Sequence, residues 1–451
     1  MKPSLRLLMT LALLVAAHRA TAQVPFTLSI SLTNGTFVRS VTTADVNNDG
    51  KPDLISVRGN PSVLYVWTNS GSGLFVSNAS YAVGSFPYQV IAADVNNDGK
   101  PDLITANNSG NSLTVLTNDG NGGFVLAAAL PMGSGTAPHS VAAADLFGRG
   151  RLDLISANSQ NATFAVWTNI GGGNFAPSLT FSVGTAQMTV PQWVTTADIN
   201  GDGKPDIIGA CNNSDIYYLH IWTNNGAGGF AVAPVPTFLI SLQGILCVTA
   251  ADVNNDGKPD LVLCMAQLTG TGVMVLTNNG LGGFGLAGNY PLGVEPYAVV
   301  ATDVNGDGQV DLVTANGSSS TTLYVLTNNG SGNFGSNATF NVGNGPESLT
   351  VADINGDGRV DIISGGWNSP GVLTVLTNAG TYMPRLALKR SGTNVIVSWL
   401  AIWTGWNLQQ NAGLDPGGWT SFGGTIGNDG TTKSATNSSA AGNHFFRLSN
   451  P

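Results

Sequence analysis

Seven aspartate-rich loops recur along the sequence at intervals of 49 to 54 residues, and their oxygen-bearing side chains have the spacing of metal ligands. The first loop, residues 45–53, reads Asp-Val-Asn-Asn-Asp-Gly-Lys-Pro-Asp. Oxygen side chains stand at positions 1, 3, 5 and 9, and the glycine at position 6 permits a sharp turn. This donor set suits a hard cation such as Ca²⁺, which takes oxygen ligands from short loops of this kind.

Six of the seven loops keep the whole donor pattern, so the sequence predicts about six structural calcium ions. In each loop the expected ligands are four side chains and the backbone carbonyl at position 7. They are Asp45, Asn47, Asp49, Lys51 and Asp53; Asp94, Asn96, Asp98, Lys100 and Asp102; Asp198, Asn200, Asp202, Lys204 and Asp206; Asp252, Asn254, Asp256, Lys258 and Asp260; Asp303, Asn305, Asp307, Gln309 and Asp311; Asp353, Asn355, Asp357, Arg359 and Asp361.

Two other interpretations of these loops fit less well. An EF-hand or dockerin loop would have an acidic residue at position 12 and flanking helices, whereas position 12 is not acidic in these six loops and strands flank them. Asx-rich turns without metal are the second interpretation, and six near-identical loops argue against it. No His, Glu or Cys is coupled to the loops, so we expect calcium to stiffen hairpins and not to catalyse a reaction.

The third loop, residues 145–153, departs from the pattern because Phe147 and Arg149 occupy positions 3 and 5. Two oxygen ligands are therefore missing from this copy. We expect the Arg149 guanidinium to lie between Asp145 and Asp153 and to replace the charge of the cation.

Short strands must position these loops, and the repeat around the second loop predicts four of them. Residues 90–95 lead into the loop, residues 103–106 leave it, and strands at 113–117 and 125–130 follow. No helical periodicity interrupts residues 24–380, so the fold class is all-β. A period near 50 residues is typical of a propeller or another repeat array.

The order of the strands indicates how the array closes. The fourth-strand pattern, which runs from a Phe to a Gly, follows six of the loops, and its seventh copy at residues 26–35 precedes the first loop. An N-terminal strand that completes the last blade closes a ring and protects its sheet edges. The sequence therefore predicts a seven-bladed β-propeller.

These repeats resemble the FG-GAP repeats, also called VCBS repeats, of integrin α-subunit propellers and of many exported bacterial proteins. The Asp-x-Asn-x-Asp-Gly-x-x-Asp loops carry the resemblance, and the Asn-x-Gly-x-Gly-x-Phe stretches and the segment at residues 86–88 match more loosely. The resemblance implies that each calcium loop joins the first two strands of a blade. It also implies an adhesion or binding role.

The ends of the chain predict export and a second domain. Residues 1–22 have the basic start, apolar stretch and small-residue cleavage site of a signal peptide, so we expect a secreted protein without a membrane span. The propeller would occupy residues 23–383. Residues 384–451 read as a small β-sandwich that is similar to C-terminal modules of exported bacterial proteins, in which Trp403, Trp406 and Trp419 pack a core or stack on sugars.

The charge composition limits the classes of binding partner, and the cysteine content limits the disulfides that can form. The formal charge is −9, and 20 of the 26 acidic residues lie in the seven loops, so the acidity reflects metal ligands. A basic stripe for nucleic acid is missing from the sequence. Three cysteines are too few for a disulfide framework; we expect buried thiols, although Cys247 and Cys264 flank one hairpin and leave a disulfide open.

The face opposite the calcium loops collects the irregular residues, and there we expect a ligand. The candidate ligand-binding residues are Tyr88, His139, Trp193, Glu295, Tyr297, Glu347 and Trp367. Aromatic side chains with a few charged groups suit a glycan or an extracellular protein. The alternative is a polysaccharide lyase or glycosidase that uses Glu295 and Glu347 as its carboxylate pair, but the sequence contains no other catalytic motif.

Overall fold

The computed structural model describes residues 24–449, apart from 34–36, 72, 185–189, 213–217, 227, 234–243, 266–270, 318–319, 344, 369–370, 381–385, 392–393, 401–406, 412–418, 429–431 and 439–444. The predicted signal peptide and two of the C-terminal tryptophans, Trp403 and Trp406, lie outside the described residues. In the described part every regular element is a β-strand, which confirms the all-β prediction. That part of the chain contains no helix able to cross a membrane.

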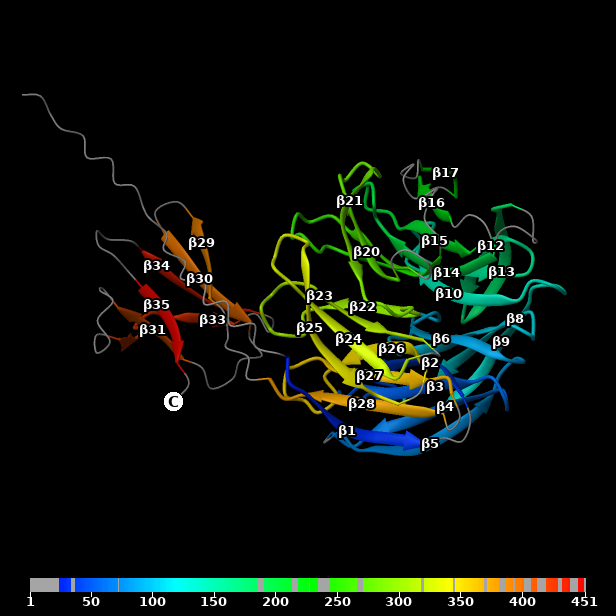
Figure 1. The fold of residues 1–451 in the computed structure, drawn as a ribbon, viewed down its shortest axis with the longest axis horizontal. Helices are drawn as coiled ribbons and strands as arrows, with labels where there is room; N and C mark the ends of the chain where they lie inside the picture. Colours follow the sequence, from blue (N-terminus) through cyan, green and yellow to red (C-terminus); the bar gives the residue numbers. More distant parts are fainter. Residues whose placement is uncertain are drawn as a thin grey trace, which may run out of the picture.

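Residues 26–378 form seven antiparallel sheets of four strands each, counted over the described part of the chain (Figure 1). The first three sheets are β2 (Val38–Ala44), β3 (Asp53–Arg58), β4 (Val63–Asn69) and β5 (Phe75–Ala82); β6 (Pro87–Ala93), β7 (Asp102–Asn107), β8 (Ser112–Asn118) and β9 (Phe124–Pro131); and β10 (Pro138–Ala144), β11 (Asp153–Asn158), β12 (Thr163–Gly171) and β13 (Asn174–Ser182). The next two are β14 (Val190–Ala197), β15 (Asp206–Asn212), β16 (Tyr218–Asn224) and β17 (Phe230–Val232); and β18 (Ile245–Ala251), β19 (Asp260–Met265), β20 (Gly272–Asn278) and β21 (Phe284–Pro291). The last two are β22 (Ala298–Thr302), β23 (Asp311–Ala315), β24 (Thr322–Asn328) and β25 (Phe334–Asn341); and β26 (Pro346–Ala352), β27 (Asp361–Gly366), β28 (Val372–Asn378) and β1 (Phe26–Thr33).

The last of these sheets joins the two ends of the repeat array. Strand β1 pairs antiparallel with β28, with Phe26 opposite Asn378 and Thr33 opposite Val372. This pairing confirms that the N-terminal strand completes the sheet of the last repeat. The innermost strands touch in the order β2, β6, β10, β14, β18, β22 and β26, and β26 returns to β2, so the sheets form a closed ring.

Burial along each strand follows its place in the ring. All six residues of β3, β7, β11 and β19 are buried, because the second strand of a sheet is covered on both faces by neighbouring sheets. The outer strand β5 is exposed at alternate positions over most of its length. Apolar cores therefore lie between sheets: Val57 and Leu64 of one sheet pack with Val90 and Leu103 of the next.

A buried Asp–Asn pair links each sheet to the one before it. Asp53 begins β3 and is fully buried; its carboxylate accepts the backbone N–H of Val46 at 3.0 Å and of Asn69 at 2.7 Å. The Asn69 amide donates to the carbonyl of Pro52 at 3.0 Å and to that of Ile354, in the last sheet, at 2.7 Å. The same contacts occur in every sheet, in the pairs Asp53–Asn69, Asp102–Asn118, Asp153–Asn169, Asp206–Asn224, Asp260–Asn278, Asp311–Asn328 and Asp361–Asn378. We call this unit the Asp–Asn latch.

Polar side chains also join the innermost strands, which share no backbone ladder. The Ser40 hydroxyl accepts the N–H of Val90 at 3.2 Å, and the Ser348 hydroxyl accepts the N–H of Val41 at 2.7 Å. Gln89 accepts the N–H of Val141 in the same way at 2.6 Å. These contacts satisfy backbone donors that face the axis of the ring.

The C-terminal segment forms two further sheets. One contains β29 (Ala387–Ser391), β30 (Asn394–Leu400), β34 (Thr432–Ser438) and β33 (Ile426–Asn428), and the other contains β32 (Thr420–Ser421), β31 (Asn407–Asn411) and β35 (Phe445–Ser449). Trp399 and Val397 of the first sheet share a core with Leu408 and Phe446 of the second. Figure 1 shows these strands beside the ring.

The Asp–Asn latch predicts a large stability cost when its amide is removed. Substitution Asn118→Ala leaves the buried carbonyls of Val46 and Pro101 without their donor, so we expect the free energy of unfolding to fall by about 2 to 4 kcal/mol. The control is Asn121→Ala, an exposed residue of the same turn, which should change it by less than about 0.5 kcal/mol. Urea unfolding measures both, and equal effects would contradict the role of the latch.

Candidate functional site

Hydrogen bonds from the main chain shape each aspartate loop. In the first loop, Asp45 accepts the backbone N–H of Asp49 at 3.1 Å and of Gly50 at 2.7 Å. Asn47 also accepts the N–H of Asp49 at 3.0 Å, and Asp49 accepts that of Lys51 at 3.0 Å. Gly50 has a φ of +82°, a conformation that glycine adopts without a steric cost. The side chains at positions 1, 3 and 5 therefore fold over one short stretch of backbone.

The oxygen ligands of the loop suit a hard cation, provided that an amide and a backbone carbonyl join the carboxylates in the ligand set. Burial raises the pKa of Asp53, its two N–H donors lower it, and the charges of Asp49 and Asp45 raise it further. The three carboxylates thus lie near enough to repel one another, and a cation between them would relieve that repulsion. Among the described residues no group of three His, Cys, Asp or Glu side chains is arranged to hold a metal, so the Asn47 amide and the Lys51 carbonyl would have to complete the ligand set.

Position 9 has a structural task in addition to any metal. Burial raises the pKa of Asp311 to about 7 and that of Asp361 to about 6, although the N–H donors of the latch oppose the shift. Each carboxylate oxygen accepts one N–H and keeps a second lone pair. A cation bound by the residues at positions 1 to 7 would also be coordinated by the position-9 carboxylate through that lone pair. It would therefore favour the ionised form of this carboxylate.

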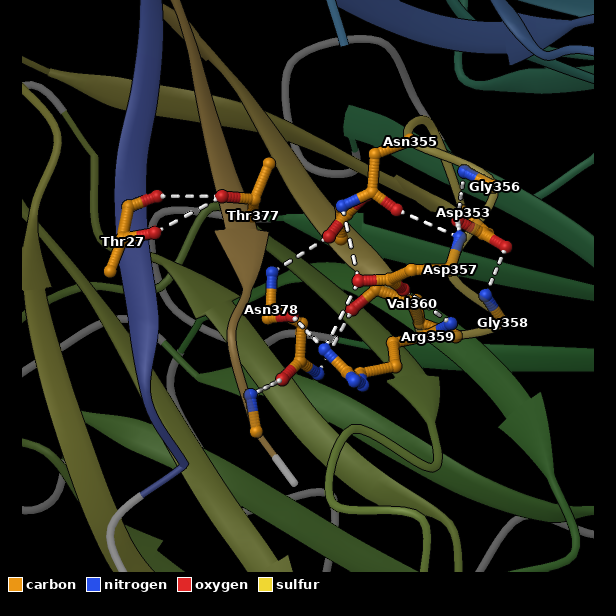
Figure 2. A network of polar contacts seen from close by, with 12 residues as sticks. Thr27, Asp353, Asn355, Gly356, Asp357, Gly358, Arg359, Val360, Thr377 and Asn378 are labelled. Atoms are coloured by element: carbon orange, nitrogen blue, oxygen red, sulfur yellow. Dashed lines mark hydrogen bonds and ion pairs between the residues drawn. The ribbon is translucent and has the colours of Figure 1, made fainter. Parts of the chain in front are cut away.

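The residue at position 7 ties the loop to the turn between the third and fourth strands. Lys100 donates to the carbonyl of Asp119 at 2.9 Å, and Lys204 donates to that of Asn225 at 2.8 Å. Figure 2 shows the last loop, where the Arg359 guanidinium reaches the Asp357 carboxylate at 3.1 Å and the Asn378 carbonyl at 3.2 Å. The aspartate loops and these turns therefore share one face of the ring.

The third loop holds its aspartates without the missing oxygen ligands. Arg149 donates to Asp153 through a guanidinium N–H at 2.6 Å, and its backbone N–H donates to Asp145 at 2.9 Å. The guanidinium carbon lies 4.8 Å from the centre of the Phe147 ring. The expected contact between Arg149 and Asp153 is confirmed, whereas Asp145 is reached by the main chain of Arg149. Asp153 still forms the latch with Asn169 at 2.8 Å.

On the opposite face, an arginine joins the first and last sheets. Arg39 of β2 forms an ion pair with Glu347 of β26 at 3.2 Å, and each side chain is only 11% exposed. The guanidinium carbon lies 3.0 Å from the ring centre of Trp367, 4.2 Å from that of Tyr88 and 5.1 Å from that of Phe86. Burial lowers the pKa of Arg39, and Tyr88 and Glu347 oppose that shift. We call these five side chains the Arg39 cluster.

His139 extends the Arg39 cluster to the third sheet. Its ring centre lies 4.0 Å from that of Tyr88. Burial and then the positive charge of Arg39 lower the pKa of His139 to about 4, so the imidazole is neutral at neutral pH. Burial also raises the pKa of Glu347, and Arg39 opposes that shift.

A channel along the axis of the ring opens beside the Arg39 cluster. It has a volume of about 440 Å³ and is lined by residues of all seven innermost strands. Arg39, Tyr88, Trp193 and Glu347 belong to its lining. The innermost strands begin at this end and run toward the aspartate loops, so the side chains that start them form the mouth of the channel.

The structure gathers most of the predicted ligand residues and leaves one apart. Tyr88, His139, Glu347 and Trp367 meet around Arg39, Tyr297 lies close enough to interact electrostatically with Arg39, and Trp193 lines the channel while packing on two cores. No contact of the described residues brings the Glu295 side chain to this cluster. Arg39 and Phe86 of this cluster are not among the residues predicted from the sequence. Between residues 24 and 380 only Arg39 and Arg58 are cations outside the aspartate loops, which was an available signal.

The three cysteines are buried thiols, as expected. Cys247 lies directly opposite Cys264 in the register of β18 and β19, and the two are free. Burial raises the pKa of Cys264, and its contact with Cys247 raises it further, so the Cys264 thiol is protonated at neutral pH.

The repeats match a known family. The model of the FG-GAP-like repeat matches residues 45–105, 94–156, 145–209, 198–263 and 303–364. Each match begins at one aspartate loop and ends in the strand that directly follows the next loop, which is the second strand of its sheet. Because the matches cover more than half of the sequence, the chain belongs to the FG-GAP-like repeat proteins, and its fold is a β-propeller. No curated protein matches the sequence.

Solved structures agree with this fold. BBS1N in complex with ARL6DN, from a crystal soaked with lead, has a TM-score of 0.57 at 11% identity, over 79% of this chain and 98% of that chain. The mercury-soaked crystal of the same complex has a TM-score of 0.53 at 12% identity, with the same coverage. An Agrocybe aegerita lectin described as recognising non-reducing terminal N-acetylglucosamine is 23% identical, with a TM-score of 0.48, over 77% of this chain and 87% of that chain. For the two BBS1N complexes the similarity at these identities concerns the fold alone.

The third loop yields a test of charge replacement. Substitution Arg149→Ala removes the partner of a fully buried carboxylate, and since Arg149 itself is 38% exposed, we expect a loss of about 1 to 2 kcal/mol in the free energy of unfolding. The matched control is Arg151→Ala, an exposed arginine of the same loop, with an expected change below about 0.5 kcal/mol. Denaturant unfolding of the two variants would contradict charge replacement if Arg151→Ala were the more damaging.

Proposed function

We propose that this protein is a secreted, calcium-stabilised binding protein, and that it recognises a glycan or an extracellular protein at the mouth of the axial channel. In this proposal each four-stranded sheet of the ring is one blade, giving seven blades, and the C-terminal sheets form a small β-sandwich. Residues 1–22 direct export. Six loops hold calcium, and the third loop does without it.

The Arg39 cluster is the observation that supports this binding face. It places three aromatic rings, a carboxylate and a guanidinium at the mouth of a channel of about 440 Å³. Binding sites of this size for small ligands are typically apolar or aromatic with a few fixed polar groups. The rest of the ring surface has no comparable assembly among the described contacts.

The enzymatic alternative, a polysaccharide lyase or glycosidase, receives less support. A glycosidase needs two carboxyl groups on either side of the scissile bond. Glu347 is engaged by Arg39, and no described contact places Glu295 beside it. We therefore favour binding without catalysis.

Calcium removal tests the metal part of the proposal. Chelation with EDTA should lower the melting temperature and added Ca²⁺ should restore it, because a ligand that binds the folded loops stabilises the folded state. Asp49→Asn should remove one calcium ion from a count of about six, whereas Asp119→Asn, an exposed aspartate outside the loops, should remove none. Calcium titration and thermal unfolding measure both effects. A melting temperature insensitive to EDTA and Ca²⁺ would refute the calcium proposal.

A binding screen with two matched variants tests the face. The full-length secreted chain is screened against immobilised glycans and extracellular matrix proteins, and each hit is repeated with Trp193→Leu and with Leu281→Ala. Trp193 lines the channel, whereas Leu281 is 84% exposed on the turn side of the ring that carries the aspartate loops. We expect at least tenfold weaker binding for Trp193→Leu and no change for Leu281→Ala. Circular dichroism checks that both variants are folded. The reverse pattern would then place the ligand on the aspartate-loop face and contradict the proposed binding face.

A further inference from the structure

We propose that the ligand of the channel mouth is an uncharged saccharide, bound end-on in the axial channel. This inference rests on the proposed function and names the chemical class of its ligand.

The mouth offers an anionic ligand no uncommitted cation. Outside the aspartate loops the ring contains two cationic side chains, Arg39 and Arg58. Arg39 is paired with Glu347 at 3.2 Å. Arg58 is only 6% exposed and donates to the Tyr65 hydroxyl at 3.2 Å. Proteins that bind carboxylate or sulfate groups present arginine or lysine side chains free to form such pairs, so a uronate or sulfated chain is disfavoured here.

His139 does not change this balance. The ring faces Tyr88, and the charged groups around it are Arg39 and, through Arg39, Glu347. A protonated imidazole beside the guanidinium would be repelled by it. Among the described residues that line the channel, Arg39 and Glu347 are the charged side chains, and their charges neutralise each other.

The channel wall combines hydroxyl and apolar side chains, both of which can contact a sugar ring. The residue three positions before the loop aspartate faces the channel in every sheet, and in four sheets it is a threonine: Thr42, Thr195, Thr249 and Thr350. The remaining three sheets place Ile91, Ala142 and Val300 there. Hydroxyls can exchange hydrogen bonds with sugar hydroxyls, while the apolar side chains and Trp193 can pack on the C–H faces of the ring.

Arg39 keeps one donor without a partner among the described residues. Its Nε is buried, while one Nη donates to Glu347. A buried polar group in this state calls for a partner from a ligand or from water. A neutral hydroxyl oxygen can accept from this Nε without competing with Glu347 for the charge of the guanidinium.

The test compares neutral and anionic oligosaccharides of equal length on the full chain. The neutral probes are cellohexaose, mannohexaose and β-1,4-galactohexaose, and the anionic probes are hexagalacturonate and hexamannuronate. Isothermal titration calorimetry gives the affinities. The measurement is made in 150 mM NaCl, where the Debye length is about 8 Å. We expect at least one neutral probe to bind ten or more times more tightly than either uronate. Uronates that bind as tightly as the neutral probes, through the same mouth, would overturn the inference and leave the binding function intact.

Two variants locate the site. Thr249→Phe fills the channel and should abolish binding of the neutral probe, whereas Thr339→Phe, on the exposed outer strand β25, should leave it unchanged.

Glu347→Gln should raise the affinity for hexagalacturonate at least fivefold, because it frees the charge of Arg39 while keeping the shape of the side chain. It therefore tests the charge argument even if Thr249→Phe fails to fold. Neutral binding that survives Thr249→Phe would refute the channel. Capture of an extracellular protein at the mouth, with no saccharide bound, would refute the saccharide class, and failure of every ligand class would refute the proposed function itself.

Discussion

The ring depends on a buried carboxylate in each sheet that is satisfied by backbone N–H groups and paired in space with a buried asparagine. A buried charge is costly unless hydrogen bonds surround it, and the latch provides two N–H donors to each aspartate. The asparagine amide then donates hydrogen bonds to two carbonyls, one of its own sheet and one of the preceding sheet. Sheets packed only by apolar side chains could slide against one another, whereas these directional contacts fix the offset between neighbours. The contact from Asn69 to Ile354 applies the same constraint where the chain ends meet.

The third loop shows that the latch does not depend on the full set of oxygen side chains in the loop. It has lost two oxygen ligands, yet it keeps Asp145, Asp153 and Asn169 in the geometry of the other sheets. The residues retained are those that hold the backbone, and Arg149 supplies a positive charge beside the buried carboxylate. The contacts on the aspartate-loop face therefore repeat almost identically from sheet to sheet. The opposite face is where the sheets differ from one another, and a ligand can be recognised there.

The regular spacing of the loops made the fold accessible from the sequence, including the transfer of β1 to the last sheet. The latch role of position 9 was not accessible, because the proposed metal ligand and the latch carboxylate are the same residue type at the same spacing. From the sequence, Asp53 is therefore predicted as a metal ligand alone. Arg39 was missed for another reason. Its partners Glu347 and Trp367 lie more than 300 residues away in the sequence and become neighbours only when the ring closes. Local patterns predict what repeats, while a site built across the closure depends on the assembled ring.

Hydrogen exchange of the full chain, with calcium and after its removal by EDTA, tests most directly whether the latch holds the ring independently of metal. The amides to compare are those that donate to the latch carboxylates, such as Val46 and Asn69, and those inside the loops, such as Asp49 and Lys51. Our account predicts that in EDTA the loop amides lose protection while the latch amides of all seven sheets remain protected. Latch amides that exchange as fast as the loop amides once calcium is removed would contradict it.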